Sequence, residues 1–271
     1  MAFPLTHLCV AWRINRNAQF LLGSIAPDAV HYRAEFMGES VKNIGATKKV
    51  THLCPVSNER WGQVTDNDGW VECVKNFARQ ARSEHHGRSE QSERFPRHRG
   101  SISSATCSLE AGYKVGYEAG YKSGYSHNFA AGYAAHCLTD LWNNKTLWHN
   151  YRTRHPKEAA KGYASGYYAD LRNIDSHLFF EHPDVADIMQ TLEIAVPEEI
   201  PGIVFAKEVD AIKNNILHEH FKDAVFDTNY HYEFVTYEDT MKFIETAAKF
   251  VADVLKDILE DVLEDVLEDS R

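Results

Sequence analysis

The chain contains one stretch that decides how the rest is interpreted, Asn128-Phe-Ala-Ala-Gly-Tyr-Ala-Ala-His-Cys-Leu-Thr-Asp140. It has no proline and is rich in alanine, so it predicts a helix. His136 and Asp140 are four residues apart, which places both side chains on one face of that helix. Two ligands at this spacing can bind one metal ion. The alternative is an ordinary helix with a hydrogen-bonded histidine and a solvated aspartate.

Small residues extend this face toward the N-terminus in steps of four. The row reads Gly112, Gly116, Gly120, Gly124, Asn128, Gly132, His136, Asp140. Helical side chains lean toward the N-terminus, so the imidazole of His136 is expected over the turn that starts at Gly132, where a glycine leaves room for it. Each of the first four glycines is followed by a tyrosine, and a second short copy of this Gly-Tyr repeat leads to Asp170. These copies predict either two ridges that pack together or a tyrosine-lined substrate groove.

Composition limits the classes of protein to which the chain can belong. Its 271 residues, 44% of them hydrophobic, suffice for one large domain or two small ones, and we expect a single domain. The net charge of −10 argues against a nucleic-acid-binding surface and against docking on anionic membranes. The binding partners that this charge still allows are basic partners or small substrates. No stretch approaches the ~20 apolar residues of a transmembrane segment.

The cysteines and the N-terminal segment favour a cytoplasmic protein. There are five cysteines, an odd number, and none forms a C-x-x-C pair, so we expect reduced thiols. Arg13 and Arg16 interrupt the apolar run that a signal peptide requires. The chain has fifteen histidines, which are potential ligands for zinc, although most of them are expected at the surface.

Three other segments place a histidine or an aspartate beside a predicted helix. Residues 5–14 predict a helix capped by Thr6, with His7 in its first turn. A short apolar helix after Phe20 should end at Pro27, and Asp28 follows at the break. A carboxylate in that position can point into a cleft. The third segment is Lys49-Val-Thr-His-Leu-Cys54, where His52 lies at a junction between a loop and a helix. Each of these residues, taken alone, is more typical of a structural role.

The chain resembles the zinc-dependent phospholipase C family in three motifs that occur in the same order. They are F-L-L-G-S-I-A-P-D-A at 20–29, K-V-T-H-L at 49–53 and F-A-A-G-Y-A-A-H-C-L-T-D at 129–140. The resemblance covers roughly the first 145 residues. It implies an all-α, single multi-helical domain with zinc ions in a cleft, related to zinc phosphodiesterases and single-strand nucleases. Some members of the family are cytoplasmic, with substrates that are mostly unassigned.

The resemblance also implies a set of metal ligands. They are His7, Asp28, His52, His136 and Asp140. Asp140 would be the bridging carboxylate, and Asp28 would be both a ligand and the candidate general base. The implied cofactor is Zn²⁺, with two ions expected and a third left open.

The chain departs from the family pattern in two places, and each concerns the ligands of one metal ion. Secreted members bind one ion through an N-terminal tryptophan, whereas Met1 lies six residues before His7 here, so that ion would be weakly held or completed by other ligands. A further zinc in the family uses a histidine shortly after the bridging aspartate and a distant H-x-x-x-E. Here Thr146 stands six residues after Asp140. Possible replacements are His149 or His155, with His177 and Glu181 at the i, i+4 spacing, unless the latter two are only a surface pair.

The remaining segments predict further helices. Residues 61–81 form an amphipathic helix, whereas residues 82–108 are nearly devoid of apolar side chains at their start and predict a mobile insertion. Helical spacing returns at 185–192 and 206–221, with an irregular piece at 226–234. Residues 237–271 predict a long acidic helix. We therefore divide the chain into a helical domain at 1–250 and an acidic C-terminal extension at 251–271.

These observations predict a metal-dependent hydrolase of a phosphoester, with a phosphodiester favoured over a monoester. Zinc would convert a water molecule to hydroxide at neutral pH, and Asp28 would orient or deprotonate that water. The substrate would be a small phosphoester or a lipid headgroup. A competing all-α class uses an adjacent His-Asp dyad, and no His-Asp dipeptide occurs in this chain. The alternative of a different kind is a non-catalytic helical interaction module with a degenerate metal cluster and an acidic tail that binds a basic partner.

Overall fold

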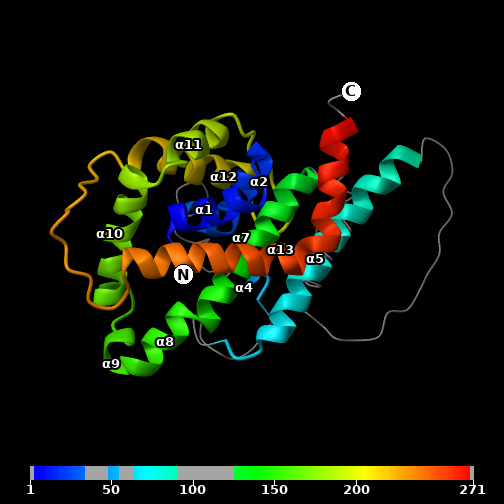
Figure 1. Cartoon of the computed structure of the whole chain (residues 1–271). Helices are drawn as coiled ribbons and strands as arrows, with labels where there is room; N and C mark the ends of the chain where they lie inside the picture. Colours follow the sequence, from blue (N-terminus) through cyan, green and yellow to red (C-terminus); the bar gives the residue numbers. More distant parts are fainter. Residues whose placement is uncertain (1–2, 34–47, 55–63, 91–124, 269–271) are drawn as a thin grey trace.

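The fold was determined as a computed structural model that describes residues 3–33, 48–54, 64–90 and 125–268. Regular structure within these ranges is helical, apart from one isolated antiparallel bridge between two residues. Figure 1 shows the helices packed around one another without a sheet. The all-α class predicted from the sequence is therefore confirmed.

The described ranges contain the following helices. In order they are α1 (Pro4–Ile14), α2 (Ala18–Gly23), the 3-10 helix η1 (Ala26–Tyr32), α4 (Lys48–Thr51), α5 (Asn67–Glu90), α7 (His127–Lys145), α8 (Leu147–Arg154), α9 (Pro156–Ala159), the 3-10 helix η3 (Gly162–Ala164), α10 (Gly166–Glu181), α11 (Val185–Glu193), α12 (Ala206–Asn214), the π-helical turn η4 (Asn215–Glu219) and α13 (Tyr237–Glu268).

Helix α7 is the element around which the others pack. It contacts α1, α2, α5 and α13, and Figure 1 shows it in the interior of the bundle. Nearly all its residues from Phe129 to Asn144 are buried. A helix surrounded on all sides has no solvent-facing stripe, which explains why its sequence is apolar or small all round. The deciding stretch of sequence is thus the central helix.

Helices α2 and α7 contact each other through their backbones at two glycines. A Cβ atom at Gly132 would lie 2.0 Å from the carbonyl oxygen of Phe20, and one at Gly23 would lie 2.1 Å from that of Phe129. The space at Gly132 is therefore occupied by the backbone of α2. The prediction that this glycine makes room for the imidazole of His136 was wrong. Its role is to let the two helices approach closely.

Helix α1 begins differently from the prediction. Its first residue is Pro4 and its N-cap is Phe3, so Thr6 is a buried residue of the first turn and not the cap. Proline is well suited to the first turn because the N–H that it lacks would have no partner within the helix. The N–H of Leu5 is instead bound by Asp175 of α10, at 3.2 Å from Oδ1. This bond joins the start of the chain to its second half.

Helices α5 and α13 cover α7 on other sides. Helix α5 begins at Asn67 and not at residue 61, and four residues of its expected apolar stripe, Trp70, Val74, Phe77 and Ala78, are buried, whereas Val71 is partly buried. The helix continues to Glu90, so it overlaps the first part of the expected insertion at 82–108, and the rest of that insertion lies outside the described residues.

The long C-terminal helix is present as predicted. Helix α13 runs without a break across the boundary placed at residue 250, and Val251 and Leu255 are buried on the far side of that boundary. The first part of the expected extension is therefore continuous with the core.

The irregular piece at 226–234 is also confirmed. It is held by the buried carboxylate of Asp170, which accepts hydrogen bonds from the backbone N–H groups of Glu233, Phe234 and Val235 at 2.7 to 3.3 Å. Asp170, to which the second Gly-Tyr copy leads, therefore holds the irregular segment 226–234 in place. None of the described helices is both long enough and apolar enough to span a membrane.

Candidate metal centre

The structure brings together all five side chains that the sequence singled out. His7 comes from α1, Asp28 from η1, His52 from the turn after α4, and His136 and Asp140 from α7. The three histidines and Asp140 are buried, whereas the side chain of Asp28 is 22% exposed. Residues separated by more than a hundred positions in the chain therefore share one small volume, with Asp28 on its open side.

Two groups of these side chains each bring three ligand atoms within 4.8 Å of one another: Asp28, His52 and His136, and His7, His136 and Asp140. His52 Nε2 lies 3.2 Å from His136 Nε2 and 3.4 Å from both Asp28 Oδ1 and Asp140 Oδ2. His136 Nε2 lies 3.9 Å from Asp28 Oδ2 and 4.0 Å from Asp140 Oδ2. Metal–ligand bonds of about 2.0–2.2 Å at tetrahedral angles place neighbouring ligand atoms about 3.3–3.6 Å apart. The contacts of His52 are close to this spacing and those of His136 with the carboxylates are longer, so each group fits a metal ion held by three protein ligands.

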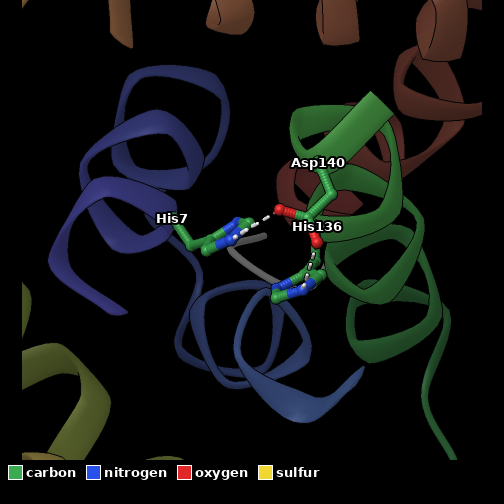
Figure 2. Close-up of side chains that lie close together, drawn as sticks. All are labelled: His7, His136 and Asp140. Carbon is green, nitrogen blue, oxygen red and sulfur yellow. Dashed lines mark ion pairs between the residues drawn. The ribbon is translucent and has the colours of Figure 1, made fainter. Parts of the chain in front are cut away.

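The second oxygen of Asp140 faces a different neighbour. Its Oδ1 lies 3.5 Å from Nε2 of His7, and Figure 2 shows the carboxylate beside the two imidazoles, with one oxygen directed at His7 and the other at His136. The rings of His7 and His136 are stacked, with their centroids 3.8 Å apart. Nδ1 of His7 has no hydrogen-bond partner in the described part of the chain. A carboxylate placed in this way can bridge two ions.

The ring nitrogens of His52 and His136 can be assigned from their hydrogen bonds. Nδ1 of His136 lies 2.7 Å from the carbonyl oxygen of Ser24, which only accepts, so this nitrogen carries the proton. Nδ1 of His52 lies 3.0 Å from Oγ1 of Thr51, and that hydroxyl donates to the carbonyl of Lys48 at 3.3 Å. Both Nε2 atoms are then left with lone pairs. Two lone pairs that face each other at 3.2 Å, beside two carboxylates, form a site for a cation.

Electrostatics keeps these imidazoles neutral. Burial lowers the pKa of His52, and the charge of Lys48 lowers it further, against the opposing effect of Asp28. Burial also lowers the pKa of His136 well below its usual range, with a further contribution from His7. Neutral imidazole is the form that binds metals, so the histidines are ready to act as ligands at neutral pH.

The two carboxyl groups are held in their ionised form. Burial alone would raise the pKa of Asp140, but its contacts with His7 and His136 outweigh burial and leave the pKa lowered. The pKa of Asp28 is likewise held well below its usual range, because Lys48 and two neighbouring histidines outweigh the effect of burial. Ionised oxygen ligands and neutral nitrogen ligands are the combination that a divalent ion requires.

Neighbouring helices fix the backbone that carries His52. The indole N–H of Trp70 in α5 donates to the carbonyl of His52 at 2.8 Å, and the hydroxyl of Tyr133 in α7 donates to the carbonyl of Thr51. Leu53 adopts a positive φ of 52°, which turns the chain sharply after the ligand. The turn after α4 is thus anchored on both α5 and α7.

The residues considered as ligands of a further ion are not part of this cluster. His149 and His155 are exposed, and His177 packs against Tyr237 and Phe226 with ring centroids 3.7 and 4.2 Å apart. Within the described ranges, the groups positioned to hold a metal ion contain none of these histidines and not Glu181. In the described part of the chain, ligands therefore converge in two groups only, one with His7, His136 and Asp140 and one with Asp28, His52 and His136. Met1 lies outside the described residues.

The second Gly-Tyr copy contributes to an aromatic cluster. Tyr167 is buried and stacks on Tyr151 at a centroid distance of 4.5 Å, whereas Tyr163 is 60% exposed and contacts Tyr168 at 4.7 Å. Packing thus accounts for Tyr167. The first copy, at 112–125, lies almost entirely outside the described residues.

One charged residue of the site was missed by the sequence reasoning. Nζ of Lys48 lies 2.7 Å from Oδ1 of Asp28 and 3.5 Å from Nε2 of His31. Lys48 precedes His52 by four residues, the same spacing that revealed His136 and Asp140. That spacing was the signal by which Lys48 could have been found.

Comparison with protein-family models, with curated proteins and with solved structures finds no match for this chain. The resemblance to zinc-dependent phospholipases C therefore rests on the three sequence motifs, each of which carries a residue of the cluster described above.

Proposed function

We propose that the chain is a zinc-dependent hydrolase of phosphoesters, with phosphodiesters favoured over monoesters, built on an all-α fold of the zinc-dependent phospholipase C type. A single observation carries the proposal. The unprotonated Nε2 atoms of His52 and His136 lie 3.4 to 4.0 Å from carboxylate oxygens of Asp28 and Asp140, while Asp140 turns its other oxygen to His7.

The donor set favours zinc over other common ions. Ca²⁺ and Mg²⁺ prefer oxygen ligands, whereas imidazole nitrogen combined with carboxylate oxygen in a four-ligand set is typical of Zn²⁺. Both imidazoles are also oriented by a second hydrogen bond, from His136 to the carbonyl of Ser24 and from His52 to Thr51. Such partners are usual at histidines that bind metals.

Two features of the chain support a phosphoester as the substrate. A carboxylate that bridges two ions is common in enzymes that stabilise the attacking and leaving oxygens of a phosphoryl centre. The second feature is Lys48, which adds a fixed positive charge beside Asp28. The two bridged ions and the ammonium of Lys48 would together concentrate positive charge where negative charge grows on the phosphoryl oxygens in the transition state.

The ion and the side chains would have different roles in the hydrolysis. When bound, Zn²⁺ acts as a Lewis acid and lowers the pKa of a water ligand to about 7. Asp28 is the ligand with solvent exposure, so its carboxylate can accept a hydrogen bond from that water and orient it toward the substrate. Because the pKa of Asp28 is held low, orienting the water is the more effective role, and removing its proton the less effective one.

The interaction module has less support. It requires a degenerate cluster, whereas all five predicted side chains are present and lie together. It also requires a free acidic tail, whereas Val251 and Leu255, at the start of that tail, are buried in the core.

Metal content and hydrolysis of model esters test the proposal together. We expect the purified chain to hold at least two zinc ions by elemental analysis and to hydrolyse a chromogenic phosphodiester faster than the matching monoester. His136→Ala should abolish both properties. His149→Ala is the matched control, because His149 is exposed and outside the cluster, and it should change neither. Less than one ion per chain, or full activity in His136→Ala, would contradict the proposal.

A further inference from the structure

Lys48 stands beside the metal centre, where its ammonium lies close to Asp28 and His31. Its side chain is 15% exposed, and its ammonium contacts Oδ1 of Asp28, the same oxygen that lies 3.4 Å from Nε2 of His52. We propose that the ammonium of Lys48 binds a non-bridging oxygen of the substrate phosphate. This inference rests on the proposed function and assigns a residue that contacts the substrate.

The backbone of α4 fixes Lys48 relative to the cluster. The N–H of His52 and the hydroxyl of Thr51 both donate to the carbonyl of Lys48, at 3.0 and 3.3 Å. Lys48 and His52 lie one helical turn apart, so one short helix directs a cation and a metal ligand to the same side. The position of the ammonium is thus coupled to that of the ligand.

Charge balance shows what Lys48 contributes. Two zinc ions would bring four positive charges, of which the carboxylates of Asp28 and Asp140 offset two, while the histidines are neutral. An ammonium in contact with Asp28 adds to this excess and repels the ions, so it does not help to retain metal. A cation with this unfavourable effect is explained when an anion binds between it and the ions. A phosphate group, with several charged oxygens, meets that requirement.

The position of Asp28 makes such contact possible. Asp28 is the member of the cluster with the greatest solvent exposure, and Lys48 and His31 both contact its Oδ1 side. The side chain of His31 is 56% exposed, whereas that of Lys48 is 15% exposed, so among the described residues Lys48 is the more buried of the two that contact this carboxylate.

The test separates the charge of Lys48 from its length and from metal retention. Lys48→Met removes the charge and keeps most of the length, and Lys48→Arg keeps the charge. Lys75→Met is the control, because Lys75 is a half-buried lysine of α5 outside the cluster, whose contact is Glu72 at 4.0 Å. For each zinc-loaded protein, zinc content is measured by elemental analysis and the affinity for inorganic phosphate by titration calorimetry. kcat and KM are then measured with a chromogenic phosphodiester.

We expect Lys48→Met to retain its zinc and to bind phosphate about tenfold to a hundredfold more weakly, as for the loss of a charged hydrogen bond. Its kcat/KM should fall by a similar factor, while Lys48→Arg recovers most of the affinity and Lys75→Met matches the unaltered chain. Unchanged phosphate affinity in Lys48→Met overturns the inference, as does loss of zinc, because Lys48 would then only position Asp28. If the unaltered protein binds phosphate through Lys48 but hydrolyses no ester, the proposed function fails and the anion site stands.

Discussion

Asp140 is the residue on which the two-ion arrangement depends, because each of its oxygens faces a different imidazole. Asp140→Asn keeps the size of the side chain but removes the charge that offsets two ions about 3.5–4 Å apart. We expect this variant to lose more than one equivalent of metal and nearly all hydrolysis, whereas His7→Ala loses at most one equivalent. Elemental analysis beside a phosphodiesterase assay measures both. Equal stoichiometry in the two variants would show that Asp140 does not bridge.

Thr51 acts on the metal through His52. Its hydroxyl accepts the Nδ1 proton of His52 and so selects the tautomer that leaves Nε2 free for an ion. Thr51→Val keeps the shape but removes the acceptor, and the loss of such a partner typically costs 10–100-fold in metal affinity. We expect that range for zinc, measured by competition with a chromogenic chelator. Thr51→Ser retains the hydroxyl and should bind zinc as the unaltered chain does, so equal losses in both variants would refute this role.

At the scale of elements, the contact between α2 and α7 sets the geometry of the site, since α2 leads directly to Ser24 and then to Asp28. A methyl group at Gly132 would overlap the carbonyl of Phe20, so Gly132→Ala must push the helices apart. Overpacking typically costs about 1–3 kcal/mol, and we expect at least this loss in the free energy of unfolding by urea titration.

The control for this prediction is Gly69→Ala in α5, where the added methyl meets the side chain of Asp66 and no backbone. It should destabilise the protein less. If Gly132→Ala unfolds at the same urea concentration as the control variant, the close approach of α2 and α7 is not needed for stability. If Gly132→Ala loses metal while keeping its stability, the contact between α2 and α7 would act on the geometry of the metal centre and not on stability.

The 3-10 helix that carries Asp28 is anchored to α12 by a buried ion pair. Arg33 follows η1 and binds the carboxylate of Glu208, with a further bond from Nη2 to the carbonyl of Ile203 at 2.8 Å. Arg33→Met leaves Glu208 buried without its partner, which typically costs 3–5 kcal/mol. We expect that loss by urea titration, with partial recovery when Glu208→Gln is added. An exposed pair, Lys161 with Glu158, gives the comparison: Lys161→Met should leave stability unchanged.

The sequence predicted those features that depend on neighbours along the chain. Helical periodicity located α5, α11 and α13, and the i, i+4 spacing found His136 and Asp140 because one helix fixes both. The cap of α1 was assigned to Thr6 because side-chain preference was considered without the stronger effect of Pro4. The neighbours of Gly132 and the contact between Lys48 and Asp28 join separate segments, so no local pattern could specify them.

At the scale of the whole molecule, burial of neutral histidines makes stability depend on pH. The folded-state pKa values of His52 and His136 lie below the unfolded value of 6.5, so the unfolded chain binds protons first as the pH falls. Their contribution is therefore present above pH 6.5 and is lost below it. We expect zinc-free protein, prepared with a chelator, to lose free energy of unfolding between pH 7.5 and 5.5. Urea titrations at three pH values measure this loss, and stability that rises on acidification would contradict it.

Bound metal should oppose that loss. Zinc that binds the folded state and not the unfolded state adds stability that grows with the ratio of its concentration to its dissociation constant, by about 2.7 kcal/mol at a hundredfold excess. We expect the melting temperature to rise when zinc is returned to the chelated protein at pH 7.5, and to rise less at pH 5.5, where protons compete for the imidazoles. An equal rise at both pH values would show that the histidines are not ligands.

Helix α13 packs against α1, α5 and α7, so the last described helix covers elements that contain the first ligand and the last. During synthesis on the ribosome, His7 through Asp140 emerge long before Phe243 to Leu255, the residues that close this side of the core. The side of α7 that α13 covers is then still exposed in the nascent chain. We therefore expect the protein to bind its metal tightly only once α13 has docked.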